Sequence, residues 1–294
     1  MDYILQESSR IEDIAFPTKI TLNIKGKLFL LDRPWVMGIL NLTPDSFFAK
    51  SRINKGKESA IHTAENMLTQ GVDILDIGGY SSRPGADHIS EKEELDRTIH
   101  VISEIKKEFP HSLISIDTFR SKVALEAVQA GADFVNDISA GNLDKAMIET
   151  VGSLEVPYIA MHMRGNPQTM TKETEYQNII LELAQFFSAK KAECIKAGIK
   201  DVIIDPGFGF AKRLEQSYWI LQNLSYFKSI QSPILVGVSR KSMIFKKLEI
   251  TPDEALNGTT ALNMYALTKG ANILRVHDVK EAIETVSLYK QLNP

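Results

Sequence analysis

Four residues spread along the chain carry side chains that suit a flat, nitrogen-rich ring. Asp117, Asn136, Asp205 and Lys241 each stand at or just after the end of a short apolar run, such as LISID or VIID. Together they offer two carboxylates, an amide and an ammonium, which can pair with the donors and acceptors of a heterocycle. A sugar or an acyl chain would match this set less well. These residues therefore predict a site for a heterocyclic ligand.

A second group of residues suits an anion. Arg275 and His277 stand in NILRVHDV, residues 272–279, and their spacing of two places them on one face of a strand. Two such donors suit a phosphate or pyrophosphate, which arginine can bind through two parallel hydrogen bonds. Asn41 ends the run WVMGILN and offers a neutral oxygen to Mg²⁺, a hard cation that accompanies pyrophosphate. We therefore expect Mg²⁺ as the cofactor.

Eight strand–helix units are predicted to position these residues. The expected strands are nearly continuous apolar runs, as in sheets that are covered on both faces. Eight units in roughly 250 residues predict an α/β fold, a (β/α)8 TIM barrel, rather than an open doubly wound sheet. Neither common nucleotide-binding glycine motif is present. The expected strands are 35–41, 72–79, 113–119, 133–139, 156–163, 201–207, 233–239 and 272–278.

In such a barrel the chemistry lies where the strands end. Every expected strand ends near a polar or ionisable residue, and buried polar groups need partners. Three of these residues also allow a structural interpretation: Asp76 could bind backbone amides, His162 could be a core histidine, and Asp137 could cap a turn. The strand-end residues are Asn41, Asp76, Asp117, Asn136, Asp137, His162, Asp205, Ser239, Arg240, Lys241, Arg275 and His277.

The remaining sequence predicts one barrel domain, 34–294, after an N-terminal segment, 1–33, with a β-hairpin turning at Lys25 and Gly26 that could cap the barrel floor. The net charge of −3 argues against a nucleic-acid partner. Cys194 is the single cysteine, so an internal disulfide is excluded. No signal-peptide pattern is visible, and no apolar run approaches the ~20 residues of a membrane span. We expect a cytoplasmic protein without a membrane partner.

Several stretches resemble the bacterial dihydropteroate synthases, in the order of that family. They are VMGILNLTPDSF (36–47), SSRPGA (81–86), SIDTF (115–119), NDI (136–138), MHMRGNPQTM (161–170), IIDPGFGFAK (203–212), LVGVSRKSMI (235–244) and RVHDV (275–279). The resemblance implies a TIM barrel that joins 4-aminobenzoate to a 7,8-dihydropterin methyl pyrophosphate in folate synthesis. It also implies an SN1-like pterin carbocation, release of pyrophosphate, a homodimer, and sulfonamides as inhibitors.

The resemblance also implies roles for individual residues. It places Asp117, Asn136, Asp205, Phe210 and Lys241 around the pterin, and Asn41, Arg275 and His277 at the pyrophosphate and Mg²⁺. It gives Phe47, Ser82, Arg83, Pro84, Lys241 and Ser242 to the aminobenzoate. It gives Asp45 the ordering of the first loop, which follows the expected strand 35–41. The catalytic set implied is Lys241, Asp117, Asp205, Arg275 and His277.

The chain departs from the family pattern in the loops after 35–41 and 72–79 and in FGFAK. After TPDSF it continues with FAKSR, where Ser-Asp-Gly-Gly is frequent. Tyr80 stands where glutamate is frequent, Ser82 where threonine is frequent, and Ala211 where glycine is frequent. Three other functions stay open: a pterin-binding methyltransferase domain, a Schiff-base aldolase using Lys241, and a non-catalytic pterin-binding barrel. The first would lack SRKS and RVHD, both of which are present here.

Overall fold

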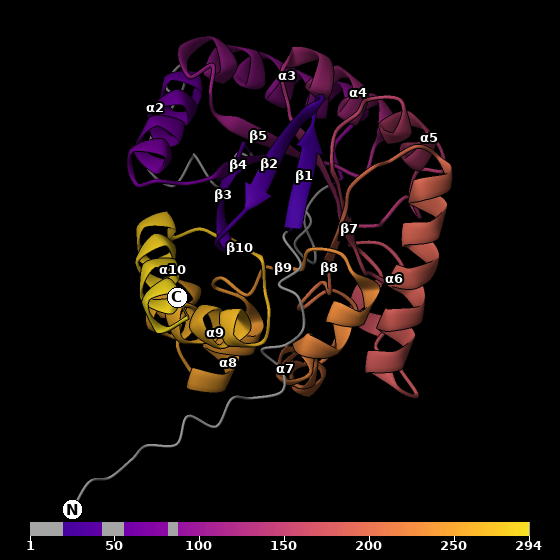
Figure 1. Ribbon diagram of the computed structural model, residues 1–294, viewed down its shortest axis with the longest axis vertical. Helices are drawn as coiled ribbons and strands as arrows, with labels where there is room; N and C mark the ends of the chain where they lie inside the picture. Colours follow the sequence, from indigo (N-terminus) through magenta and orange to yellow (C-terminus); the bar gives the residue numbers. More distant parts are fainter. Residues whose placement is uncertain (1–19, 43–55, 82–87, 294) are drawn as a thin grey trace, which may run out of the picture.

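The protein is a barrel of parallel strands surrounded by helices, seen in a computed structural model that describes residues 20–42, 56–81 and 88–293 (Figure 1). Within these ranges the sheet order is β8-β7-β6-β5-β4-β3-β10-β9, and a bridge between Ile204 and Ile234 joins the two ends of that order. The (β/α)8 prediction is confirmed. The barrel strands are β3 (Trp35–Asn41), β4 (Ile74–Gly78), β5 (Leu113–Asp117), β6 (Phe134–Asp137), β7 (Tyr158–Met161), β8 (Val202–Asp205), β9 (Leu235–Val236) and β10 (Ile273–Val276).

Helices connect the strands on the outside of the barrel. Eight strand–helix units imply one helix between β9 and β10, whereas the structure has two, the short α8, which was not predicted, and the longer α9. The α-helices are α2 (Gly56–Thr69), α3 (Glu91–Glu108), α4 (Ser121–Ala130), α5 (Met147–Gly152), α6 (Ile179–Lys196), α7 (Leu214–Gln222), α8 (Ser242–Leu248), α9 (Leu256–Thr268) and α10 (Val279–Leu292). Short 3₁₀ helices are η2 (Met170–Lys172), η3 (Leu224–Ile230) and η4 (Pro252–Glu254).

Helix α3 illustrates how the sequence sets an element that borders the site. The Ser90 hydroxyl caps its N-terminus by accepting a hydrogen bond from the Glu93 backbone N–H at 3.1 Å. Acidic residues in the first turn and lysines in the last turn complement the helix dipole. Ile102 and Ile105 are fully buried on the barrel side. The cap therefore fixes where Glu94, a buried carboxylate in the first turn, meets the barrel.

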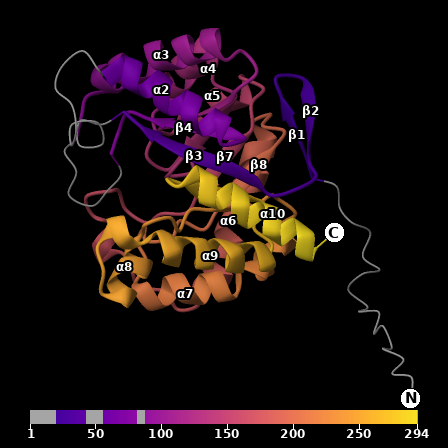
Figure 2. The same cartoon turned by 90° about the vertical axis from the view of Figure 1, so that its left-hand side faces the viewer.

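The predicted β-hairpin is present and covers the amino end of the barrel. Strands β1 (Ile20–Ile24) and β2 (Lys27–Leu31) are antiparallel and turn at Lys25–Gly26, where both residues have positive φ. The side chains of Leu22 and Ile24 are buried against the inside of the barrel. Figure 2 shows the hairpin at one end of the molecule. The opposite end of the barrel therefore carries the carboxyl ends of the strands.

The strands point alternate side chains into the barrel and toward the helices. On β4, Leu75 and Ile77 pack in the large core between strands and helices, whereas Ile74 lies in the interior cluster. Near the amino ends that interior is apolar. It consists of Leu22, Ile24, Trp35, Met37, Ile74, Phe134, Ile159, Ile203, Leu235 and Ile273. Two residues further along several of these strands, the same inward face becomes polar.

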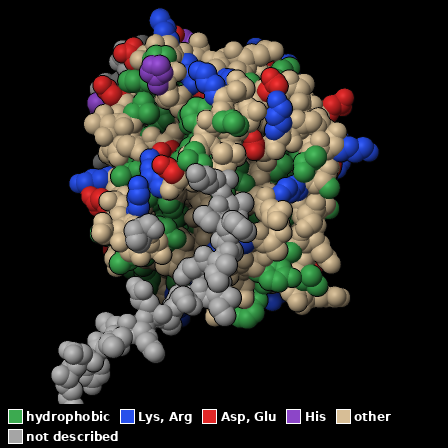
Figure 3. Space-filling view, in the orientation of Figure 1, with side chains coloured by type: hydrophobic (Ala, Val, Ile, Leu, Met, Phe, Trp, Pro, Cys, Tyr) green, Lys and Arg blue, Asp and Glu red, His purple; other side chains and the backbone are tan. Residues whose placement is uncertain are grey.

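Basic and acidic side chains are interspersed on the hairpin end of the molecule (Figure 3). Within the described ranges, no helix combines the length and the apolar character that a bilayer crossing requires.

Candidate active site

Strand register brings the predicted heterocycle-binding residues together inside the barrel mouth. Asp117 of β5 pairs in register with Asn136 of β6, and Gly78 of β4 lies on the other side of Asp117. The Asn136 amide donates to Asp76, with Nδ2 3.2 Å from Oδ2. Asp76 is fully buried and Asn136 nearly so. The carboxylates and the amide therefore form one connected polar group in the interior.

Arg275 connects this group across the barrel. Its Nε donates to Asp76 Oδ2 and its Nη2 donates to Asp117 Oδ2, both at 2.6 Å. Among the described residues, no hydrogen bond involves its Nη1. Burial raises the pKa of Asp117 to about 7, against the opposing effect of Arg275. Burial alone would lower the pKa of Arg275, but the Asp76 and Asp117 carboxylates raise it above its ordinary value.

Lys241 faces the same space from the start of α8. Its ammonium donates to the Phe208 carbonyl at 2.7 Å and lies 4.9 Å from the centroid of the Phe210 ring. Burial lowers the pKa of Lys241 to about 8, although the nearby Asp205 carboxylate opposes the shift. Burial also raises the pKa of Asp205. Lys241 forms no ion pair with a described carboxylate, so a ligand ring could be held between Lys241 and Asp205.

The structure places His277 on the inward face of the chain just beyond β10, two residues after Arg275. The Ser239 hydroxyl lies 3.0 Å from His277 Nδ1 and accepts from the His277 backbone N–H at 3.2 Å. Because that oxygen accepts from the backbone, its own hydrogen can be donated to Nδ1. In the tautomer that accepts this hydrogen on Nδ1, the neutral His277 ring carries its own hydrogen on Nε2, a nitrogen that can donate to an anion.

Asn41 is the residue predicted to hold Mg²⁺. It pairs in register with Gly78, which in turn pairs with Asp117, so the Asn41 amide stands beside the polar group. A side chain at Gly78 would come within 3.5 Å of Asn41 Oδ1, so the glycine leaves space there. No cluster of three acidic, histidine or cysteine ligands occurs in the described chain. A single amide oxygen fits Mg²⁺ that keeps waters and binds substrate phosphates, the usual mode for this ion.

Five residues of the predicted aminobenzoate and first-loop sets lie outside the described residues: Asp45, Phe47, Ser82, Arg83 and Pro84. Ser242 is described and begins helix α8, directly after Lys241. Phe210 is described and packs beside Met161, Met163 and Met170 at the mouth.

Three polar residues near strand ends are directed away from the barrel interior: Asp137, Arg240 and Asp278. Asp137 accepts from the backbone N–H groups of Ser139 and Gly141, both at 2.7 Å, and from the Tyr158 hydroxyl. The turn-capping interpretation is therefore confirmed. Arg240 forms a two-point ion pair with Asp278, at 2.9 and 2.7 Å.

Asp278 stands at the start of helix α10, but its carboxylate does not bind the backbone of that helix. Arg240 binds both of its carboxylate oxygens, so the carboxylate links the start of α10 to the β9–α8 connection. Its role is therefore structural.

His162 is a buried structural histidine rather than a ligand-facing one. Its Nδ1 lies 3.0 Å from Lys212 Nζ, and its ring packs edge-on against Phe186 at 4.8 Å. Lys212 also donates to the carbonyls of His162 and Phe210. Burial lowers the pKa of both His162 and Lys212 well below their ordinary values. This pair therefore fixes the backbone beside the Phe210 ring.

Two inward residues contribute more to the site than the sequence indicated, namely Asp76 and Met161. Asp76 binds both Arg275 and Asn136. Side chains on one face of a strand recur every second residue, so Asp76 lies on the same inward face as Gly78. Met161 pairs in register with Asp205 and supplies an apolar surface at the mouth. Gly207 allows this close packing, since a side chain there would come within 2.3 Å of the His162 carbonyl.

Comparison with known proteins agrees with this geometry. A model of the pterin binding enzyme family matches residues 37–277. The dihydropteroate synthase of Synechocystis is 47% identical over 84% of this chain and 86% of its own length. The chain belongs to the dihydropteroate synthase family. A Yersinia pestis dihydropteroate synthase, crystallised with a sulfonamide drug, has a TM-score of 0.87 and 37% identity, covering 93% of this chain and 99% of that one.

A second solved dihydropteroate synthase, from Xanthomonas albilineans with 4-aminobenzoic acid, has a TM-score of 0.86 and 33% identity over 94% of this chain and 99% of that one. The predicted family, the fold class and the assignment as a transferase of folate synthesis are thereby confirmed. Membership of the dihydropteroate synthase family does not by itself assign roles to single residues. Those roles, Mg²⁺ and the homodimer remain predictions.

Proposed function

We propose that the barrel mouth condenses 7,8-dihydropterin methyl pyrophosphate with 4-aminobenzoate, with the pterin held by Asp117, Asn136, Asp205 and Lys241. One observation carries this assignment: carboxylates and an amide from separate strands, and an ammonium from the start of α8, converge on one buried space. The flat ring would lie against Phe210 and Met161, whose side chains border that space. Its ring N–H and amino groups would donate to the carboxylates, and Lys241 would donate to a ring acceptor.

The reaction would begin with cleavage of the bond between the pterin methylene carbon and the pyrophosphate oxygen. The electron pair leaves with the pyrophosphate, and positive charge spreads from the methylene carbon into the ring. Asp117 and Asp205 would stabilise that charge, an effect that is large in a dry site. The amine nitrogen of 4-aminobenzoate then bonds to the carbon and loses a proton. The chemistry requires no nucleophilic side chain.

The departing pyrophosphate would be received by Arg275 and His277. Arg275 is oriented by two carboxylates and keeps Nη1 for the anion, while Ser239 orients the His277 ring. Two carboxylates offset much of the Arg275 charge, so we assign His277 a larger share of the anion contact than the sequence suggested. When bound, Mg²⁺ would be held by Asn41 and would add positive charge at the pyrophosphate.

We assign the aminobenzoate end to the outer mouth, with Lys241 and Ser242 there and with the predicted Phe47, Ser82, Arg83 and Pro84. The ligands of the Xanthomonas and Yersinia enzymes, 4-aminobenzoic acid and a sulfonamide, support both the second substrate and this inhibitor class.

A homodimer is also proposed, supported by exposed apolar side chains on α7, α8 and α9, namely Trp219, Leu248 and Tyr265. Sedimentation would test it. A cytoplasmic location remains a prediction.

The proposed reaction is tested by pyrophosphate release in a coupled assay with both substrates and Mg²⁺. We expect release that depends on 4-aminobenzoate and formation of dihydropteroate in equal amounts. Binding of the pterin without any release would instead support a non-catalytic pterin-binding barrel. Omission of the aminobenzoate is the matched control, because it leaves the pterin site filled.

A further inference from the structure

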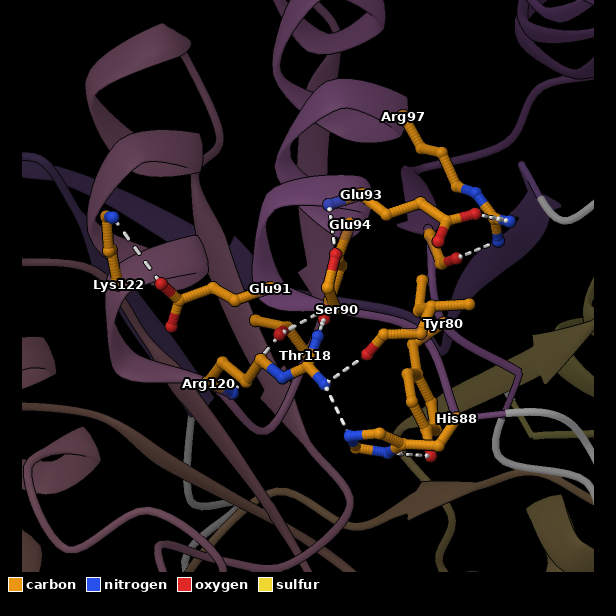
Figure 4. A network of polar contacts seen from close by, with 12 residues as sticks. Tyr80, His88, Ser90, Glu91, Glu93, Glu94, Arg97, Thr118, Arg120 and Lys122 are labelled. Atoms are coloured by element: carbon orange, nitrogen blue, oxygen red, sulfur yellow. Dashed lines mark hydrogen bonds and ion pairs between the residues drawn. The ribbon is translucent and has the colours of Figure 1, made fainter.

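Tyr80 stands two residues beyond the end of β4, where the barrel interior opens into the mouth. Its side chain is buried, and its ring meets Phe119 edge-on at 5.0 Å. The Tyr80 hydroxyl oxygen lies 3.3 Å from His88 Nδ1 and accepts from the Gln168 amide at 3.1 Å. Figure 4 shows Tyr80 and His88 side by side, with Arg120 reaching toward both. Tyr80 therefore links three parts of the mouth.

Arg120 anchors this arrangement to the barrel wall. Its Nη1 donates to the buried carboxylate of Glu94 at 2.7 Å, and its Nη2 donates to the Ile89 carbonyl at 2.7 Å. The guanidinium also lies 5.5 Å from the Tyr80 ring centroid and 3.5 Å from His88 Nε2. In the tautomer with Nε2 accepting from Arg120, the His88 ring carries its hydrogen on Nδ1, which faces the Tyr80 hydroxyl oxygen.

The contact between Tyr80 and Gln168 joins two connections that lie far apart in sequence. Gln168 belongs to the segment between β7 and α6, close to the buried Met170. The other end of that segment is tied to the β8–α7 connection, because the Tyr176 hydroxyl donates to the Ala211 carbonyl at 3.0 Å. Ala211 follows Phe210, whose ring faces Lys241. The end of this segment beside the proposed pterin pocket is therefore anchored independently of Tyr80, which ties only its start.

We propose that Tyr80 is a positioning residue that sets the affinity for the second substrate, an aryl amine with a carboxylate. The inference rests on the proposed function. The pterin groups lie within the barrel, whereas Tyr80, Phe119 and Gln168 lie beyond the strand ends, where the aryl amine must approach the pterin methylene carbon. Tyr80 acts through Gln168 by fixing the separation of the β4 and β7 connections. Its loss alters the fit of the aryl amine and leaves the pterin contacts unchanged.

The test compares Tyr80→Phe, Gln168→Ala and the double variant in steady-state assays with both substrates varied. Each single variant removes one side of the same hydrogen bond. We expect KM for 4-aminobenzoate to rise about fivefold, as the loss of one partly buried hydrogen bond predicts. KM for the dihydropterin pyrophosphate stays within about twofold, and the double variant resembles the singles because both act through one contact. Inhibition by 4-aminobenzenesulfonamide weakens by the same factor.

Two controls keep the test decisive. Tyr226→Phe removes the same atom from an exposed ring on η3, near the amino end of the barrel, and should leave both KM values unchanged. Gln168 is exposed, so Gln168→Ala folds normally and tests the contact even where Tyr80→Phe does not fold. Equal changes in both KM values, additive effects, or no change would overturn the proposal. If the unsubstituted enzyme shows no activity in this assay, the proposed function is overturned together with this inference.

Discussion

The two ends of the barrel interior use the same strands for opposite purposes. On β8, Ile203 is fully buried in the apolar cluster under the hairpin, and Asp205, two residues later on the same face, lies in the polar group at the mouth. On β4 the same step leads from Ile74 to Asp76. Apolar burial at the amino end supplies free energy of folding. Charges at the carboxyl end lose hydration and are held for a ligand.

This contrast predicts that substitutions at the two ends separate activity from stability. Mouth residues outside the Arg275 ion pairs, such as Lys241 and Asp205, should affect turnover with little loss of fold, because removing a poorly solvated charge relieves its cost of burial. Residues under the hairpin should affect stability with little change in turnover per folded molecule.

The largest effect on activity is expected for Lys241→Ala. Loss of a buried donor beside the reacting ring should lower kcat/KM about 10²–10³-fold. The midpoint of thermal unfolding should stay within about 2 °C of the parent, because the ammonium bonds one carbonyl and makes no described ion pair. Pyrophosphate release and calorimetric unfolding measure the two quantities. Kinetics like those of the unsubstituted enzyme would remove Lys241 from the site.

The largest effect on stability is expected for Ile203→Ala. The cavity left in the interior cluster should lower the free energy of unfolding by about 2–5 kcal/mol, measured by urea denaturation. Turnover per folded molecule should remain near that of the parent. A large loss of turnover at full folding would mean that the amino end also shapes the chemistry.

A smaller effect is expected from the pH dependence of activity and stability. Activity should rise as Asp117 ionises near pH 7 and fall as Lys241 loses its proton near pH 8. The apparent pKa values of the activity profile belong to the coupled groups together. The raised pKa of Asp117 means that the folded state holds a proton that the unfolded state has lost. Stability therefore falls as the pH rises from the ordinary carboxyl value of 3.8 toward 7.

The lowered pKa of Lys241 has the opposite consequence at higher pH. Between about pH 8 and pH 10.5 the unfolded state binds the extra proton, so stability rises with pH across that interval.

Asp117→Asn should reduce the loss of stability between pH 5 and pH 8, measured by urea denaturation at each pH. Asp96→Asn, on the exposed side of α3, is the control and should leave that difference unchanged.

The sequence predicted the barrel because its strands are continuous apolar runs that alternate with helical patterns. It also predicted the strand-end positions of Asp117, Asn136, Asp205 and Lys241. The pairing of Arg275 with Asp76 and Asp117 could not be predicted, because these partners lie 199 and 158 residues away in the chain. The alternation of side chains along a strand distinguishes the inward Asp76 from the outward Asp137. Using it requires the exact strand register, which the apolar runs alone did not fix.

Helix α8 was missed for a related reason. Its seven residues follow Lys241 directly and are too few to show a helical period in sequence. The helix is held in place by tertiary contacts, since a side chain at Gly258 of α9 would come within 2.4 Å of Ile244. Its first residues nevertheless place Lys241 and Ser242 at the mouth.

The most direct test of the contrast compares Asp205→Asn with Ile203→Ala on the single strand β8. Pyrophosphate release per folded molecule should fall about 100-fold for Asp205→Asn and stay near the parental value for Ile203→Ala. Stability should show the reverse order, with the large loss confined to Ile203→Ala. Equal losses of turnover in the two variants, or full activity with Asp205→Asn, would contradict the assignment of the chemistry to the carboxyl end of the barrel.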